Sequence, residues 1–244
     1  MSDFKLNIVH LYPDLLNLYG DKGNIETFKK RLLWRGINVD VKECTCDNTQ
    51  IDFDETDVFL LGGGTEREQK AVLGKLLEHK KEFCDFAENG GTILAVCGGF
   101  ALLGKELKDK DGVFEGLGVL DIFTDLTKSE NRLIGNVILE CEGLSDKVVG
   151  FENHGGRTDI KNHTPLGKVL KGLGNDGKSG FEGVVYKNVT ATYLHGPLLP
   201  KNPELCDKIL LKALQNKYSD FTELLPLNDE LEKAANGYIT EKYL

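Results

Sequence analysis

Short apolar runs and amphipathic stretches alternate along the first 105 residues. Four runs have the length and the Val, Ile and Leu content of buried strands, and they cover residues 5–12, 37–41, 57–61 and 92–96. Apolar side chains recur at helical spacing over about residues 24–35 and again over about residues 66–88, which predicts one helix in each stretch. This alternation is typical of parallel βαβ units in a doubly wound, mostly parallel sheet flanked by helices.

The second half of the chain has a different pattern. Between about residues 112 and 193, short strand candidates are separated by glycine and asparagine, and they cover residues 133–139, 147–151, 183–186 and 190–193. We expect these antiparallel or mixed strands to complete the same α/β domain.

Helical patterns close the chain at residues 203–217 and 228–243, and Asn228 and Asp229 are suitable caps for the second helix. The sequence has no evident linker, repeat or low-complexity segment. We therefore expect a single domain over residues 1–244, with a motif-bearing core at about 6–214 and a C-terminal helical extension at 215–244.

Composition narrows the class of protein. The chain of 244 residues is 40% hydrophobic and 28% charged, as in ordinary globular proteins. Its net charge of -9 argues against a nucleic-acid or anionic-membrane surface. No apolar stretch approaches the roughly 18 residues of a membrane span, and residues 1–5 show no signal-peptide pattern. With six cysteines and no secretion signal, we expect reduced thiols and a cytoplasmic location.

Two patterns resemble binding motifs but lack the context that those motifs need. Cys44 and Cys46 form a C-x-C pair without a second pair or suitably spaced histidines, so we expect no metal site. Residues 172–179 match the P-loop pattern G-x-x-x-x-G-K-S, but Ser179 is followed by Gly180 and Gly183 instead of a helix. We interpret this segment as a flexible hairpin loop and expect no nucleotide there.

Cys97 is the strongest candidate for chemistry. It ends the apolar run at residues 92–96 and precedes Gly98 and Gly99, after which a helix is predicted. The two glycines permit a sharp turn that lifts the thiol out of the sheet. We expect the helix N-terminus to lower the pKa of this thiol. Taken alone, the stretch is equally consistent with a buried structural cysteine.

A cysteine nucleophile needs a base, and His195 is the preferred one among five histidines. It follows a long apolar run, as Cys97 does, and ligands bind at the carboxyl ends of strands in open α/β sheets. His154 follows a shorter run and is the second choice. His10, inside the first strand, is expected to be a core residue.

Glycines provide a source of backbone donors for an oxyanion. The amide of Gly98 is next to the nucleophile, and residues 62–64 are a triglycine that ends the neighbouring strand. Two such N–H groups are what acyl transfer requires, and Gly63 or Gly64 is expected to supply the second. An ordinary glycine-rich turn is the simpler alternative for each segment taken alone.

These residues resemble the class I glutamine amidotransferases, with their glycine-rich oxyanion loop, cysteine elbow and late histidine. The segment 150–154, Gly-Phe-Glu-Asn-His, is similar to the cobyric-acid-synthase-like branch. Residues 11–25 resemble the N-terminal signature of the GatD group, glutaminase subunits of lipid II isoglutaminyl synthase. The resemblance extends over about residues 6–214 and implies the flavodoxin-like fold of class I amidotransferases.

The resemblance also implies roles for residues and partners. Cys97 would be the nucleophile, His195 the base, and Arg132 a contact to the α-carboxylate of glutamine, for which its planar guanidinium is suited. The ammonia would pass to a Mur-ligase-like subunit, MurT, that amidates the D-glutamate α-carboxyl of lipid II. ATP and Mg²⁺ would belong to that subunit, and this chain would need no cofactor.

One position departs from the class I pattern. Many of these enzymes carry a glutamate two residues after the catalytic histidine, and here that position is Pro197. The acid that orients His195 would then come from the partner subunit, and Asp21 and Glu152 remain as internal alternatives. Glutaminase activity would be weak until the complex forms.

Three other functions are also consistent with the sequence. The chain resembles enzymes that amidate a corrinoid acid, and a stand-alone cysteine hydrolase on the DJ-1-like fold would use a similar elbow. A non-catalytic regulatory subunit is a further possibility, but the intact set of Cys97, His195 and triglycine argues against it.

Overall fold

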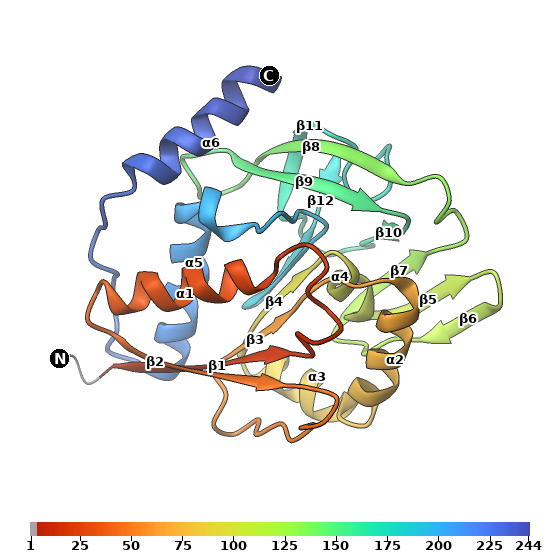
Figure 1. The fold of residues 1–244 in the computed structure, drawn as a ribbon, viewed down its shortest axis with the longest axis horizontal. Helices are drawn as coiled ribbons and strands as arrows, with labels where there is room; N and C mark the ends of the chain where they lie inside the picture. Colours follow the sequence, from red (N-terminus) through yellow and green to blue (C-terminus); the bar gives the residue numbers. More distant parts are fainter. Residues whose placement is uncertain (1–3) are drawn as a thin grey trace.

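A six-stranded, mostly parallel sheet forms the centre of the computed structural model, which describes residues 4–244 (Figure 1). The strand order is β13-β14-β4-β3-β1-β2, and only the edge strand β13 runs antiparallel to its neighbour. The bounds are Lys5–Leu11 for β1, Asn38–Cys44 for β2, Val58–Leu61 for β3, Thr92–Val96 for β4, Val184–Tyr186 for β13 and Val189–Thr192 for β14. The predicted doubly wound sheet is confirmed.

Helices cover both faces of this sheet because its inner strands β3, β4 and β14 are buried on both sides. In β3, Val58 and Leu60 pack with α1 (Lys22–Leu33) and α5 (Pro203–Lys217). Phe59 and Leu61 point to the opposite face, where α2 (Glu66–Leu77) and α3 (Lys80–Glu88) lie. All four β3 residues are buried.

The helix predicted over residues 66–88 is wrong as one helix, because the chain breaks at Glu78 and His79. The backbone at His79 leaves the helical region, with φ −118° and ψ 22°, and α3 begins after it. The break brings both Leu76 and Phe83 into the same hydrophobic core.

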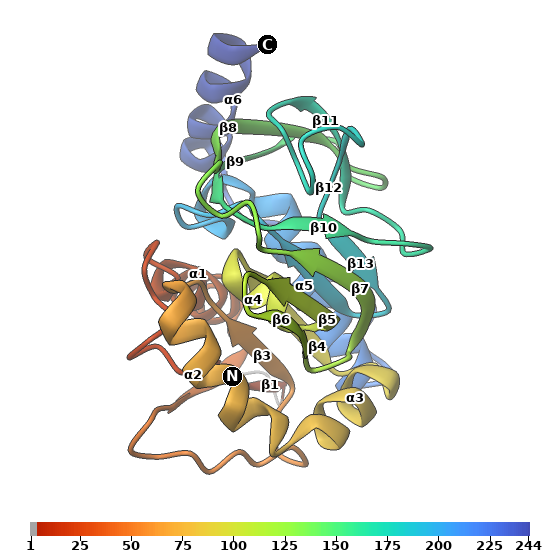
Figure 2. The ribbon, with the colours of Figure 1, turned by 90° about the vertical axis from the view of Figure 1, so that its right-hand side faces the viewer.

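The added strands mostly form two further sheets instead of extending the central one (Figure 2). One has the order β10-β7-β5-β6 and the other the order β12-β11-β8-β9. The strands of the first are β5 (Gly104–Asp109), β6 (Gly112–Glu115), β7 (Leu120–Asp125) and β10 (Arg157–Asp159). Those of the second are β8 (Leu133–Glu140), β9 (Val148–His154), β11 (Gly167–Lys171) and β12 (Phe181–Glu182).

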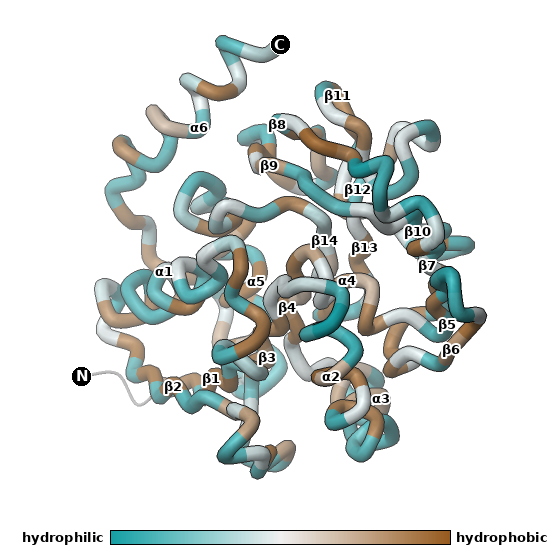
Figure 3. The backbone as a smooth tube through the Cα atoms, turned by 45° about the vertical axis from the view of Figure 1, so that its right-hand side comes forward, coloured by the Kyte–Doolittle hydropathy of each residue, from teal (hydrophilic) through white to brown (hydrophobic). Residues whose placement is uncertain are grey.

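The chain ends in α6 (Glu230–Tyr243), which projects from the rest of the molecule (Figure 3). Its Leu231 is 83% exposed. The helix is attached through Asn236, whose Nδ2 donates to the carbonyls of Lys147 and Lys201 at 2.8 and 2.9 Å. A short 3₁₀ helix, Leu199–Lys201, precedes α5.

Candidate active site

Cys97 lies on the predicted elbow between β4 and α4 (Gly98–Leu102). Its backbone has φ 53° and ψ −113°, a strained conformation for a residue with a side chain. Gly99 makes the turn possible, because a Cβ there would lie 2.4 Å from the carbonyl oxygen of Leu61. Its N–H donates to the Gly62 carbonyl at 3.1 Å, which joins the elbow to the triglycine.

The expected lowering of the Cys97 pKa is not found. Burial raises the pKa of this thiol to about 12, and the nearby carboxylate of Asp21 raises it further. The Gly98 amide, which hydrogen bonds to the sulfur, and the guanidinium of Arg132 act in the opposite direction. The α4 helix has only five residues, so its dipole does not outweigh desolvation.

A cavity of about 460 Å³ opens beside the thiol. The elbow contributes Cys97 and Gly98 to its wall, and the triglycine contributes Gly64 but not Gly63. Opposite lie side chains from the additional sheets and their loops, namely Leu126, Arg132, Asn153 and His154. The structure therefore brings the predicted glutamine contact Arg132 to the same cavity as Cys97.

Arg132 is held in place by Asn153, a residue that is not among the site residues predicted from the sequence. The Arg132 Nε donates to Asn153 Oδ1 at 2.5 Å, and Nη2 donates to the Asn153 carbonyl. Tyr19 Oη donates to that same carbonyl at 3.3 Å. Asn153 belongs to the Gly-Phe-Glu-Asn-His segment, which was the available signal in the sequence.

The structure places His195 just after the strand that neighbours the elbow. Strands β4 and β14 are parallel neighbours, and the Cys97 N–H donates to the Thr192 carbonyl at 2.8 Å. Beyond β14, His195 pairs with Phe151 through two backbone hydrogen bonds of 3.0 and 3.2 Å. The carboxyl ends of two adjacent strands thus carry the predicted nucleophile and base.

The Tyr19 ring covers the imidazole of His195 in this conformation. The two rings are stacked, with centroids 3.8 Å apart and planes inclined by 13°. Tyr19 lines the cavity and His195 does not. Burial, together with the charges of Lys201 and Arg132 and with His154, lowers the pKa of His195 to about 4.

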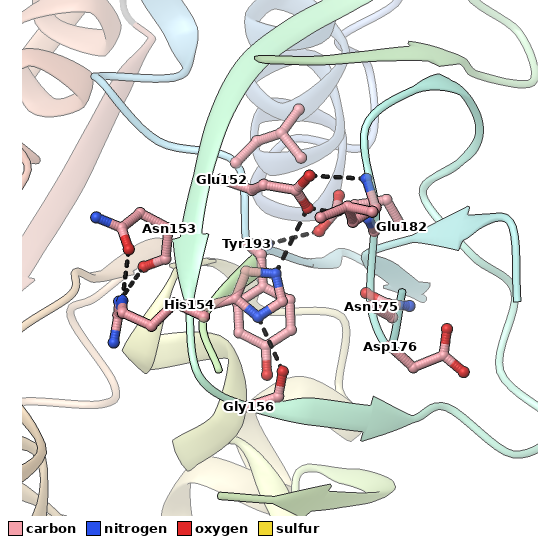
Figure 4. A network of polar contacts seen from close by, with 12 residues as sticks. Glu152, Asn153, His154, Gly156, Asn175, Asp176, Glu182 and Tyr193 are labelled. Atoms are coloured by element: carbon pink, nitrogen blue, oxygen red, sulfur yellow. Dashed lines mark hydrogen bonds and ion pairs between the residues drawn. The ribbon is translucent and has the colours of Figure 1, made fainter. Parts of the chain in front are cut away.

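His154, the second choice for the base, lines the cavity but is fixed by other contacts (Figure 4). Its ring stacks on Tyr193 at 3.6 Å with an interplanar angle of 2°, and its Nδ1 lies 2.9 Å from the Gly156 carbonyl. Its Nε2 lies 3.6 Å from Glu152 Oε2, which is longer than a hydrogen bond.

The glycine loop that matches the P-loop pattern binds a carboxylate of the protein itself. It is the connection of the β11–β12 hairpin, as predicted. The amides of Leu173 and Gly174 donate to the fully buried Glu152 at 2.7 and 2.9 Å. A second buried acid, Glu182, accepts from the Tyr193 amide at 2.6 Å and so fixes the end of β14 near His195. Burial raises the pKa of Glu182 to about 8.

Neither internal candidate for the orienting acid contacts His195. Asp21 accepts the Gly63 N–H at 3.0 Å, and Glu152 lies beside His154. Within residues 4–244, the Nε2 of His195 is buried without a hydrogen-bond partner. Pro197 occupies the position where many class I enzymes carry the orienting glutamate. It packs closely against the start of α1, because a Cβ on Gly23 would lie 2.5 Å from Pro197 Cγ.

No helix within residues 4–244 is long and apolar enough to cross a membrane. In the same part of the chain, no three His, Cys, Asp or Glu side chains gather as they do around a metal ion.

Residues 7–203 match the family model of the CobB/CobQ-like glutamine amidotransferase domain. The chain belongs to this family. The GatD subunit of lipid II isoglutaminyl synthase (glutamine-hydrolyzing) from Staphylococcus aureus is 41% identical over 239 residues, which cover 98% of this chain and 96% of that subunit. GatD from Streptococcus pneumoniae is 38% identical over 244 residues, which cover 98% and 91%. The chain therefore falls in the GatD group of this family.

More distant relatives share part of their length or the fold alone. A probable cobyric acid synthase from Methanocaldococcus jannaschii is 31% identical over 77% of this chain but over only 40% of its own length. The structure of PurLQS from Thermotoga maritima aligns with a TM-score of 0.54 at 17% identity, covering 88% of this chain and 100% of that one. The expected class I amidotransferase fold is confirmed, and family membership sets aside the DJ-1-like hydrolase.

Proposed function

We propose that this chain is the glutamine-hydrolysing subunit of a lipid II isoglutaminyl synthase. It would release ammonia from L-glutamine to a Mur-ligase-like, MurT-like subunit that uses ATP and Mg²⁺. That subunit would amidate the D-glutamate α-carboxyl of lipid II during peptidoglycan synthesis in the cytoplasm. The observation that carries this proposal is the match to two GatD subunits over nearly their whole lengths. The alternative corrinoid acceptor has less support, because the cobyric acid synthases match over less than half of their own length.

In the first step, glutamine enters the cavity with its α-carboxylate on Arg132. The Cys97 thiol transfers its proton to the imidazole of His195, and the sulfur attacks the side-chain amide carbon. The carbonyl π bond breaks, and the resulting oxyanion is stabilised by backbone N–H groups of Gly98 and Gly64. Both glycines line the cavity beside the thiol.

In the second step, the imidazolium of His195 protonates the amide nitrogen, and the C–N bond breaks to release ammonia. A thioester on Cys97 remains. His195 then takes a proton from water, whose oxygen attacks the thioester carbon, and glutamate leaves as the sulfur is reprotonated. Each proton that His195 takes is returned within one turnover, so no cofactor is needed in this chain.

The isolated subunit is poorly prepared for the first proton transfer. The pKa of Cys97 is about 12 and that of His195 about 4, so the proton stays on sulfur. Tyr19 also lies over the imidazole. An acidic residue from the synthetase subunit would raise the pKa of His195 and fix its tautomer, as the Pro197 departure suggests.

The proposal is tested with both subunits and with glutamine labelled with ¹⁵N in its side-chain amide. Lipid II, ATP and the two subunits should yield a stem peptide whose new isoglutamine amide carries ¹⁵N. Cys97→Ala in the same complex should yield none from glutamine but should retain amidation from added ammonium. Release of ¹⁵N-labelled ammonia from glutamine while lipid II stays unamidated would refute this acceptor.

A further inference from the structure

The loop before α1 packs against the triglycine, and Asp21 is its contact point. The Asp21 side chain is fully buried. Its Oδ2 accepts the Gly63 N–H at 3.0 Å, and its Oδ1 is buried without a hydrogen-bond partner in the described part of the chain. A buried carboxylate with a single backbone hydrogen bond costs stability, and burial raises its pKa to about 6. Packing alone gives no reason for a carboxylate at this position.

The peptide between Gly62 and Gly63 is held at both of its polar ends. Its carbonyl accepts the Gly99 N–H of the elbow at 3.1 Å, and its N–H donates to Asp21. A planar trans peptide fixed at both ends has little rotational freedom. The triglycine is thereby tied to the nucleophile on one side and to the loop before α1 on the other.

Close contacts around the triglycine restrict where its backbone can lie. A Cβ on Gly62 would lie 2.7 Å from Asp21 Oδ2, and a Cβ on Gly63 would lie 3.4 Å from the Cys97 sulfur. The next carbonyl, that of Gly63, accepts the Leu18 N–H at 3.0 Å. These contacts leave Gly64, not Gly63, in the wall of the cavity.

We propose that Asp21 is a positioning residue for the oxyanion hole. It holds the Gly63 amide, and the backbone is thereby oriented with the Gly64 amide facing the substrate. Gly63 then donates to Asp21 and not to the oxyanion, which selects Gly64 and Gly98 from the sequence-based candidates. This inference rests on the proposed glutaminase function of Cys97. Asp21 itself touches neither substrate nor the reacting atoms.

The test compares Asp21→Leu and Asp21→Asn in the assembled complex, under conditions in which the wild type hydrolyses glutamine and Cys97→Ala does not. Leucine removes the acceptor at similar volume, whereas asparagine keeps a carbonyl oxygen for the Gly63 N–H. Asp14→Leu is the matched control, because Asp14 lies in the same loop and its carboxylate also accepts a backbone N–H at 3.0 Å, from Cys46.

The expected result is a loss in kcat with little change in KM. Loss of one oxyanion donor lowers kcat by about 10²–10³-fold, and we expect about 10²-fold for Asp21→Leu. KM should stay within about threefold, because Arg132 binds the α-carboxylate in the ground state as well. Asp21→Asn should recover at least about tenfold of that loss, and Asp14→Leu should match the wild type.

A second readout separates positioning from unfolding. Alkylation of Cys97 by iodoacetamide needs no oxyanion hole, so its rate should not fall in Asp21→Leu. The rate should increase if anything, because the Asp21 carboxylate raises the pKa of the thiol. Wild-type or higher kcat in Asp21→Leu would overturn the proposal, as would a parallel loss of alkylation and turnover. Failure of wild-type turnover would instead count against the proposed function.

Discussion

Replacing Arg31 by methionine should destabilise the whole chain and release its C-terminal part first. Arg31 lies on α1 and is only 1% exposed. Its guanidinium donates to Asp207 of α5 at 2.6 and 2.7 Å and to Asp229, just before α6, at 2.6 and 3.0 Å. Methionine has a similar length but no charge, so it would leave both carboxylates facing an apolar side chain.

The size of the stability loss depends on how well Asp207 and Asp229 are still compensated after the substitution. Breaking a buried ion pair on one side costs about 3–5 kcal/mol, because the remaining charge is uncompensated. Asp207 keeps Arg35, whose Nη2 donates to it at 2.6 Å, and Asp207 and Asp229 are 26% and 15% exposed. We therefore expect the lower end of that range, a loss of about 3 kcal/mol in the free energy of unfolding.

Urea denaturation measures this loss, and limited proteolysis between residues 218 and 229 reports on detachment of α6. Lys81→Met is the matched control, since its ion pair with Asp85 is exposed and should contribute little to the free energy of unfolding. A loss below about 1 kcal/mol for Arg31→Met, with unchanged proteolysis, would show that packing and not charge holds the C-terminal extension.

Five further substitutions test the site. Cys97→Ala should abolish glutamine hydrolysis in a folded protein, and a diazo-ketone analogue of glutamine should label Cys97; labelling spread over the other cysteines would contradict a single nucleophile. His195→Ala should cost orders of magnitude in kcat/KM and His154→Ala much less, and the reverse order would mean that the base is misassigned. Lys178→Ala should leave glutaminase turnover unchanged, whereas ATP-dependent protection of its loop from proteolysis would reveal a functional P-loop. In the folded protein the pKa of Asp21 lies above its unfolded value of 3.8. The stability that the protonated Asp21 contributes is therefore lost as the pH rises from about 4 to 6. Asp21→Asn should show a smaller fall in the free energy of unfolding over that range.

The isolated chain and the complex should also differ in rate. Equal kcat/KM with and without the synthetase subunit would mean that the acid orienting His195 is internal. An orienting acid is worth up to about 10⁴-fold where the base is otherwise intact, so activation by the partner should be easy to measure.

Elements with a clear apolar run or helical periodicity were predicted correctly from the sequence. The bounds of β4 and of α5 agree with the apolar run at residues 92–96 and the helical pattern at 203–217. The break at His79 and the β5–β6 hairpin were not predicted. The amphipathic patterns of these two segments are compatible with more than one secondary structure. Packing against segments that are distant in the sequence decides which one forms.

Contacts between segments distant in the sequence also explain why some predictions about the site were wrong. The elbow at Cys97 was recognisable from Gly98 and Gly99, but its pKa depends on burial by segments far away in the sequence. Tyr19 was visible as part of a signature, yet nothing local indicated that its ring stacks on His195. Asp21 was suggested as a partner for that histidine and instead holds the triglycine.

The position of β14 has a consequence for synthesis of the protein. Strand β4, whose five residues are all buried, pairs with β3 on one edge and with β14 on the other, and β14 is translated almost 100 residues later. A chain that stops before residue 189 would leave an apolar edge strand unpaired, which favours aggregation. It would also lack His195. Prematurely terminated chains should therefore be lost as insoluble protein and should not release ammonia from glutamine.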